Sequence, residues 1–350
     1  MKRILMLGVL LAAICVSGYA QKKPYKVVFY NLENFFDTQN DPDVLDDEFT
    51  PEGPKKWTQD KYNKKLTNIE KVFFDIAAIN KDYPAVIGVC EVENRNVLED
   101  IVATEKLAPA NYRIVHYDSP EARGVDAAFI YRPDVLKLEG SKAIRTVIPS
   151  LPDFKTRDIV AMWGKIEGED FLFMVAHWPS RLGGKEASEF KRIAVGHQMR
   201  QIADSVRALR PATKVVMMGD FNDDPIDSSI SGADGIGAKV KVKEVQPADY
   251  YAPYAALLKA GYGTLAYGDA WNIFDNIVVS GNLLDGEKGK LQILKAEKSK
   301  FYGNIFKRHY MIQKEGQYKG YPLRTFVGNN FQGGFSDHFP VCLLYTSDAA

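Results

Sequence analysis

Six short runs of acidic, amide and histidine residues stand where hydrophobic segments begin or end. They are Asn31–Asn34, Glu91–Asn94, His177–Arg181, Gly219–Asp224, Asp275–Asn276 and Ser336–His338. Carboxylate and amide oxygens are ligands for hard cations such as Mg²⁺, Mn²⁺ or Ca²⁺. A phosphoester needs its anionic oxygens neutralised, its attacking water deprotonated and its leaving oxygen protonated. The residue types therefore point to metal-assisted attack of water on a phosphoester.

Each run taken alone also has an ordinary structural interpretation. Asp220, Phe221 and Asn222 fit a turn, because Asp and Asn favour turns. His177 fits a buried histidine, and Asp337 with His338 fits a surface pair. Six such runs in one chain make coincidence much less probable than it is for any single run.

The hydrophobic pattern predicts the elements that position these runs. In residues 26–32, Val27, Phe29 and Asn31 share one face of a strand. Tyr62 and Ile76 delimit apolar residues at helical spacing. Further strands are predicted at 85–92, 112–117, 125–131, 159–166, 171–177, 214–219, 273–280 and 339–345, and a second helix at 186–209.

Two segments have no clear period. Residues 37–54 are acidic and contain three prolines, which predicts a loop. Residues 228–268 are rich in Gly, Ala, Pro and Tyr; they fit an insertion over the active site or, the favoured interpretation, a surface excursion. No linker divides the chain, so we expect one α/β domain from residue 25 to 345.

Residues 1–20 have the pattern of a cleaved signal peptide. A basic start is followed by a short apolar run and by small residues up to Ala20. We expect a secreted or periplasmic protein that begins near Gln21, with no membrane insertion of the mature chain. Cleavage removes Lys2 and Arg3, which leaves 43 basic and 45 acidic residues and a net charge of −2. Strong non-specific binding of polyanions is not expected from that balance, although it permits a local basic patch.

Two cysteines remain in the mature chain, Cys90 and Cys342, and both lie in apolar runs. An exported protein permits a disulfide between them. Buried free thiols are the favoured alternative.

The order of the motifs resembles the endonuclease/exonuclease/phosphatase superfamily, which includes pancreatic-type deoxyribonucleases, abasic-site endonucleases, bacterial sphingomyelinases and inositol-polyphosphate phosphatases. Gly219-Asp220-Phe221-Asn222 and Ser336-Asp337-His338 are the most specific parts of the resemblance, which extends over nearly all of the mature chain. The opening at residues 31–37 and the run at 90–94 resemble an exported bacterial branch. The resemblance implies a four-layer α/β sandwich of two packed, mostly antiparallel sheets flanked by helices.

The resemblance also implies roles for the acids. Glu91 matches a direct metal ligand and Asn31 a residue of the same metal site. Glu33 is a weaker ligand candidate, placed on the face of Asn31 by the period of a strand. Asp275 and Asp337 match acids near a second metal position and near the family's histidine.

The remaining roles concern the substrate. Asp220 matches the residue that deprotonates or orients the attacking water, and Asn222 the partner of a phosphate oxygen. His338 matches the histidine that stabilises the transition state. His177 matches a histidine that is the general acid in some relatives and a supporting residue in others. The candidate phosphate clamps are Arg123, Arg157 and Arg181, for which surface ion pairs are an equal alternative.

Together these features predict a phosphoesterase that uses Mg²⁺ or Mn²⁺, with Ca²⁺ as a further candidate. Nucleic acid is the leading substrate, which makes the protein an exported nuclease. A small phosphodiester, a lipid headgroup or a phosphomonoester is the alternative within the same chemistry. A binding protein that kept the fold without turnover is the alternative of another class. The sequence does not determine the oligomeric state.

Overall fold

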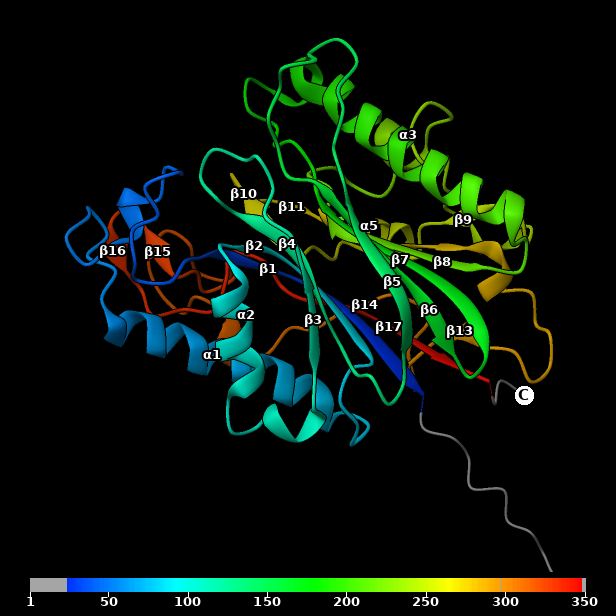
Figure 1. The fold of residues 1–350 in the computed structure, drawn as a ribbon, viewed down its shortest axis with the longest axis horizontal. Coiled ribbons are helices and arrows are strands. Elements are labelled where there is room, and N and C mark those ends of the chain that lie inside the picture. Colours follow the sequence, from blue (N-terminus) through cyan, green and yellow to red (C-terminus); the bar gives the residue numbers. More distant parts are fainter. Residues whose placement is uncertain (1–23, 297, 348–350) are drawn as a thin grey trace, which may run out of the picture.

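The computed structural model describes residues 24–296 and 298–347. The predicted signal peptide, residues 1–20, lies outside the described residues. Within them, two β-sheets pack face to face, and helices cover the outer face of each sheet (Figure 1). The predicted four-layer α/β sandwich is confirmed.

The first sheet has seven strands. Its order is β13 (Gln292–Leu294), β17 (Val341–Thr346), β1 (Tyr25–Phe35), β2 (Val86–Val92), β4 (Asp126–Tyr131) and β3 (Arg113–His116), and β14 (Asn304–Ile305) also pairs with β17. The β1–β2 pair is parallel and the other pairs are antiparallel. Helices α1 (Gln59–Ala78) and α2 (Arg95–Ala103) cover its outer face (Figure 1).

The second sheet has six strands. Its order is β5 (Lys137–Ile144), β6 (Ile159–Ile166), β7 (Glu169–His177), β8 (Lys214–Asp220), β12 (Asp275–Ser280) and β9 (Tyr250–Tyr251). The β7–β8 pair is parallel, and helix α3 (Lys185–Leu209) packs on the outer face (Figure 1). Smaller elements are α4 (Ser228–Ser231), α5 (Ala255–Lys259) and the hairpins β10 (Leu265–Tyr267) with β11 (Ala270–Asn272) and β15 (Phe326–Val327) with β16 (Asn330–Phe331).

Alternation along the strands creates the core. On β1, Val27 and Phe29 face the second sheet, whereas Val28 and Tyr30 face the layer of α1. The sheets approach closely at Gly88, where an added Cβ would lie 2.4 Å from the Met218 sulfur. Buried side chains between the two sheets and beneath both helical layers therefore hold the strand ends in fixed positions.

Most of the predicted elements are present, with bounds shifted by a few residues. Strand β5 and helix α2 were missed. Strand β5 is an edge strand without fully buried residues, so it lacks the apolar run that marks the inner strands. Helix α2 has nine residues, which give little helical period to detect.

The two cysteines are free thiols. Cys90 on β2 belongs to the central core between the sheets, and Cys342 on β17 belongs to the core beneath α1. Their side chains therefore lie on opposite faces of one sheet, which explains the absence of a disulfide. No helix in the described part of the chain is both long and apolar enough to span a bilayer.

Candidate active site

Residues at or near the ends of five strands, drawn from both sheets, meet at one edge of the sandwich. The register places His177 of β7 and Asp275 of β12 on either side of Asp220 of β8. From the other sheet, the Asn31 amide Nδ2 donates to Glu91 Oε1 at 3.1 Å and to Asp220 Oδ2 at 3.0 Å. The structure thus brings five predicted site residues from distant parts of the sequence into one cluster.

Left-handed backbone conformations aim several of these side chains. Glu33, Asn34, Glu91 and Asn222 have φ angles of 50°, 48°, 58° and 52°. Glu91 is the extra residue where the β2–β4 register shifts between Cys90 and Val92. Non-glycine residues rarely adopt this conformation, and its presence in these motifs is consistent with a candidate site.

The same irregularity corrects the expected position of Glu33. The β1–β2 register shifts between Asn31 and Phe35, so the strand period fails over this stretch. Glu33 Oε2 accepts a hydrogen bond from the Thr325 backbone N–H at 2.6 Å, and Glu33 lies close to Asp337 and Lys65. Burial raises its pKa to about 7, and Asp337 adds to that shift. Glu33 therefore joins the cluster through its backbone N–H, which donates to Asn31 Oδ1 at 2.8 Å, whereas its carboxylate is bonded to Thr325.

Aromatic packing joins the motifs of β7 and β8. The Trp178 ring stacks on Phe221 with centroids 4.1 Å apart, and the Trp178 backbone N–H donates to the Asp220 carbonyl at 2.9 Å. Asn222 Nδ2 donates to the Trp178 carbonyl at 3.0 Å, and the Asn222 backbone N–H donates to Asp220 Oδ1 at 2.9 Å. Gly219 is required here, because an added Cβ would lie 1.9 Å from the Ala176 carbonyl oxygen.

The two site histidines have opposite electrostatic environments. Burial lowers the pKa of His177 well below its ordinary value, and the positive charges of Arg157 and Arg123 add to that shift. Burial also opposes the charged form of His338, but the combined charges of Asp275, Asp220 and Asp337 outweigh it and hold its pKa well above the ordinary value. The surroundings therefore favour the neutral form of His177 and the charged form of His338.

His338 is held by a direct contact with a carboxylate. Its Nδ1 lies 2.7 Å from Asp275 Oδ2, which leaves Nε2 directed toward Asp220 Oδ2 at 3.8 Å and Asp337 Oδ1 at 3.9 Å. His177 Nε2 lies 3.8 Å from Asp220 Oδ2 and 3.9 Å from Glu91 Oε1. Both imidazoles thus present Nε2 to the same carboxylate.

Asp220 is at the centre of this arrangement and is 2% exposed. Burial raises its pKa to about 6; His338 opposes the shift, and Asp275 and Glu91 add to it. A carboxylate with a pKa near 6 is ionised at neutral pH and remains basic enough to accept a proton from water.

The residues fit a divalent cation. Ligand atoms of Glu91, His177 and Asp220 lie within 4.8 Å of one another, and Asp275 Oδ1 is buried without a hydrogen-bond partner. The charges of Asp275 and Glu91 raise the pKa of buried Asp220, and a positive ion would stabilise its ionised form. The oxygen-rich set matches the ligand preference of Mg²⁺ or Mn²⁺.

The three predicted arginine clamps differ in their contacts. Arg157 is buried and donates to the carbonyls of His177 and Trp178. Arg181 donates to the Asn222 carbonyl and pairs with acids of the loop that follows it. Arg123 donates to Asn34 Oδ1 at 3.1 Å and pairs with Glu121 at 3.0 Å, and its side chain is 43% exposed. Arg123 is therefore the clamp candidate with the most exposed side chain.

Three further residues contribute to the site, although the sequence analysis assigned none of them a role. The Asn34 backbone N–H donates to Glu91 Oε2 at 2.9 Å, and Ser336 Oγ donates to the Asn31 carbonyl at 2.7 Å. Both lie inside predicted motifs, which was the available signal. Arg324 pairs with Asp337 at 3.1 Å from a loop without a periodic pattern, and nothing in the sequence indicated it.

A family model with the description "Endonuclease/Exonuclease/phosphatase family" matches residues 26–346. The chain belongs to this family. It includes nucleases, phosphatases and phosphodiesterases, and its enzymes are typically dependent on divalent metals. The resemblance inferred from the motifs is confirmed. No curated protein matches the sequence.

Solved structures share the fold at low sequence identity. Humanized D. rerio TDP2 with 14 mutations aligns with a TM-score of 0.54 and 13% identity, over 93% of this chain and 100% of that one. The human Nocturnin catalytic domain with a bound sulfate anion aligns with a TM-score of 0.54 and 15% identity, over 93% of this chain and 95% of that one. The mannosyl-6-phosphatase Bt3783 of Bacteroides thetaiotaomicron aligns with a TM-score of 0.53 and 16% identity, over 92% of this chain and 99% of that one.

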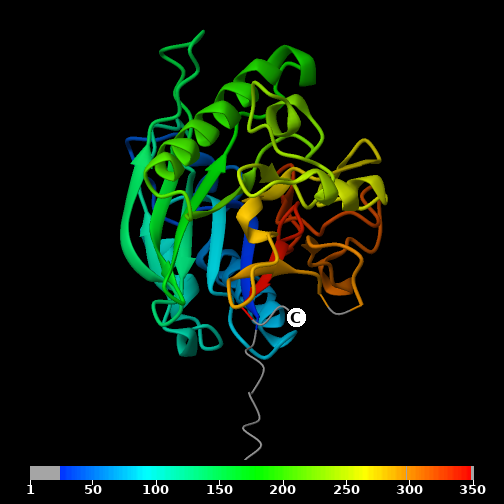
Figure 2. The same cartoon turned by 90° about the vertical axis from the view of Figure 1, so that its right-hand side faces the viewer.

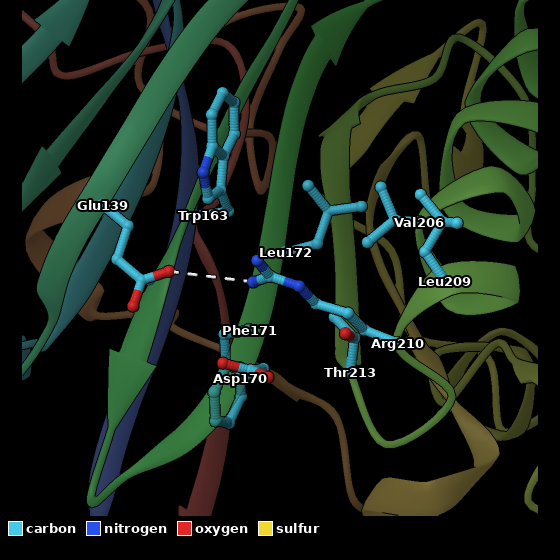
Figure 3. Close-up of a pocket in the computed structure, with 10 residues that line it drawn as sticks. Glu139, Trp163, Asp170, Phe171, Leu172, Val206, Leu209, Arg210 and Thr213 are labelled. Atoms are coloured by element: carbon cyan, nitrogen blue, oxygen red, sulfur yellow. Dashed lines mark ion pairs between the residues drawn. The ribbon is translucent and has the colours of Figure 1, made fainter.

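A separate cavity lies at the opposite end of the second sheet. It has a volume of about 260 Å³ and lies near the start of β7 and the end of α3, where Arg210 and Glu139 form an ion pair of 3.8 Å (Figure 3). Its walls include Trp163, Leu172 and Val206. None of the six motif runs contributes to it, so it is distinct from the edge where those runs meet.

Proposed function

We propose that this protein is an exported, divalent-metal-dependent phosphoesterase that hydrolyses phosphodiester bonds of nucleic acid. The observation that carries the reaction class is the convergence of Glu91, Asp220, Asp275 and both histidines at one edge of the sandwich. Export rests on the sequence pattern of residues 1–20.

The chain's own groups divide the proton transfers between them. Asp220 accepts the proton of the attacking water, because it is ionised and lies within 4 Å of both imidazoles. The P–O bond to the leaving oxygen breaks as the water attacks, and that oxygen takes up a proton from solvent. His338, kept charged by Asp275, donates from Nε2 to a phosphate oxygen as negative charge develops there. A divalent cation held by Glu91 and its neighbours would supply Lewis acidity at the phosphate and raise the acidity of the water.

Neutral His177 supports this arrangement from the other side of Asp220. Its lowered pKa favours the neutral form at 3.8 Å from Asp220 Oδ2, so it does not neutralise the base. Arg123 and Asn222 are the candidates for contacts with the phosphate oxygens. This assignment keeps the base and the charged donor on separate residues, as their environments require.

A specific observation favours a second candidate, a small phosphoester. A cavity of about 330 Å³ adjoins Glu33 and Asp337, and three cations line it: Lys55, Arg123 and Arg324. Its charges are balanced by acids, which suits a small polar substituent better than a duplex. The solved relative named as a mannosyl-6-phosphatase shows that the fold can serve such a substrate.

The test is a screen with Mg²⁺ or Mn²⁺ against plasmid DNA, RNA, bis-p-nitrophenyl phosphate, p-nitrophenyl phosphate and sphingomyelin. We expect turnover of nucleic acid and of the small diester, abolished by chelator. Asp60 is an exposed carboxylate on α1, and Asp60→Asn is the matched control for Asp220→Asn. Turnover of the monoester alone would favour the second candidate. No turnover of any substrate would point to a binding protein with the same fold.

A further inference from the structure

A second large cavity lies at the β9 edge of the second sheet. It has a volume of about 720 Å³ and lies between residues 240–259 and a wall that contains Lys295, Lys300, Phe301 and Tyr302. In Figure 2 these yellow and orange segments both lie on the right-hand side of the molecule. Much of one wall comes from the segment 228–268, whose role the sequence left open.

The interior of the cavity is apolar and aromatic. Tyr251 is buried in its wall, and Leu258, Phe301 and Tyr302 are partly exposed beside it. Tyr262, which is 53% exposed, lies next to Phe301 with ring centroids 6.0 Å apart. Partly exposed rings at a cavity of this size offer faces on which a planar ligand can stack.

Positive charge surrounds this interior. The lining lysines are Lys241, Lys243, Lys259, Lys295 and Lys300, all exposed. Lys241 pairs with Glu244 at 3.1 Å, and Lys295 lies 5.2 Å from the centroid of the Tyr302 ring. Across residues 24–296 and 298–347, no carboxylate lies within ion-pair distance of Lys243, Lys259 or Lys300. A chain of near-zero net charge therefore has a local basic patch here.

The cavity is connected to the catalytic edge through one loop. Ile226 lines the cavity, and it belongs to the loop that begins with the Asp220–Asn222 motif. Arg181 fixes that loop through Asp227 at 2.9 Å. Tyr251 pairs with Val279, four residues along β12 from Asp275, or roughly 13 Å at the rise of a strand.

We propose that this cavity binds a single-stranded segment of the nucleic-acid substrate next to the bond that is cleaved. Bases stack on the rings of Phe301 and Tyr302, and the backbone phosphates contact the lysine rim. A lysine rim around aromatic faces is the combination that binds single strands without sequence preference. The recessed, aromatic shape favours a nucleic-acid strand over a flat anionic membrane. The proposal rests on the proposed function and names its substrate class.

The primary variant is Lys243→Gln/Lys300→Gln. Its matched control is Lys137→Gln/Lys142→Gln, on β5 at the opposite edge of the same sheet. Binding of a labelled single-stranded oligonucleotide of about 20 nucleotides is measured in chelator by fluorescence anisotropy at several salt concentrations. Each lost phosphate contact makes the negative slope of log K against log salt shallower by about 0.7. The slope of the primary variant, which loses two contacts, should therefore be shallower by about 1.4. We expect roughly tenfold weaker binding at low salt for this variant and wild-type binding for the control.

Phe301→Leu keeps an apolar side chain and removes the aromatic face. We expect oligonucleotide binding about tenfold weaker with an unchanged salt slope, because stacking is lost and charge is kept. Hydrolysis of bis-p-nitrophenyl phosphate should be the same in the wild type and all three variants, since that substrate is too small to reach the cavity. Circular dichroism confirms that each variant is folded.

The results separate this proposal from the proposed function. Failure of the wild type to hydrolyse either the oligonucleotide or the small diester would refute the nuclease function, whereas the binding measurement would still decide the role of the cavity. Equal affinity and equal salt slope in the wild type and Lys243→Gln/Lys300→Gln would overturn the proposal. If Lys243→Gln/Lys300→Gln lost the binding of phosphatidylserine vesicles and kept oligonucleotide binding, that result would also overturn the proposal and assign the cavity to membrane docking.

Discussion

Asp220→Asn tests the central assignment, because it removes a charge and leaves the shape of the side chain. The carboxylate accepts hydrogen bonds from Asn31 Nδ2 and from the Asn222 backbone N–H. Loss of a positioned base costs about a hundredfold to ten-thousandfold in rate. We therefore expect kcat on the best substrate to fall by that factor, with KM changed less.

The same substitution has opposing effects on stability. Burial raises the pKa of Asp220 from 3.8 to about 6, so the folded state binds a proton in this window that the unfolded state has lost. Wild-type stability therefore falls as pH rises through the window, and at one pKa unit per 1.36 kcal/mol the ionised group costs about 3 kcal/mol above pH 6. The Asp220→Asn variant would avoid that cost, but its new amide leaves one of the two donors unpaired, at about 1–3 kcal/mol.

The two terms predict a stability difference that depends on pH. In chelator, the melting temperature of Asp220→Asn should be near that of the wild type at neutral pH. Near pH 4 Asp220 is protonated in the folded wild type, so the variant no longer gains from avoiding a buried charge. The variant should then be less stable than the wild type by about 1–3 kcal/mol in denaturant unfolding. A folded variant that keeps more than about a tenth of the wild-type kcat would refute the role as base. A stability difference independent of pH would refute the electrostatic argument.

Four further outcomes are expected. Chelator should abolish turnover and Mg²⁺ or Mn²⁺ restore it, and Glu91→Gln should weaken cation binding in calorimetry more than it lowers the melting temperature. His338→Gln should lower kcat by about a hundredfold or more, and Asp275→Asn, which lowers the pKa of His338, should move the alkaline limb of the kcat profile to lower pH. Burial lowers the pKa of Lys26 from 10.5 to about 8, so between these pH values the unfolded protein binds a proton that the folded protein has lost. The stability of the wild type relative to Lys26→Met should therefore rise by up to about 3 kcal/mol from pH 8 to pH 10.5, as measured by denaturant unfolding. N-terminal sequencing of the exported protein should begin at or near Gln21, whereas retention of Met1 would refute cleavage.

The sequence was most informative where local chemistry and a regular period coincide. The alternation of Val27, Phe29 and Asn31 placed β1 and its inner face correctly, and the motifs at strand ends identified the residues that meet in the site. Periodicity failed for β5, whose edge position leaves it without an apolar run. It also failed at Glu33, where a register shift and positive φ angles redirect the side chain.

The order of acids, amides and histidines along the chain was enough to identify the family and, through that resemblance, the fold, because the motifs stand where buried strands begin or end and strand ends share an edge. Only the tertiary structure decided which residues touch. It placed Asp275 rather than Asp337 next to His338 Nδ1 and shifted the pKa values of the two histidines in opposite directions. It also gave Arg157 and Arg181 hydrogen-bond partners inside the protein. It also gathered lysines from 241 to 300 around one cavity. Such contacts and pKa values depend on distances between residues far apart in the chain, which packing of the two sheets sets and local sequence does not record.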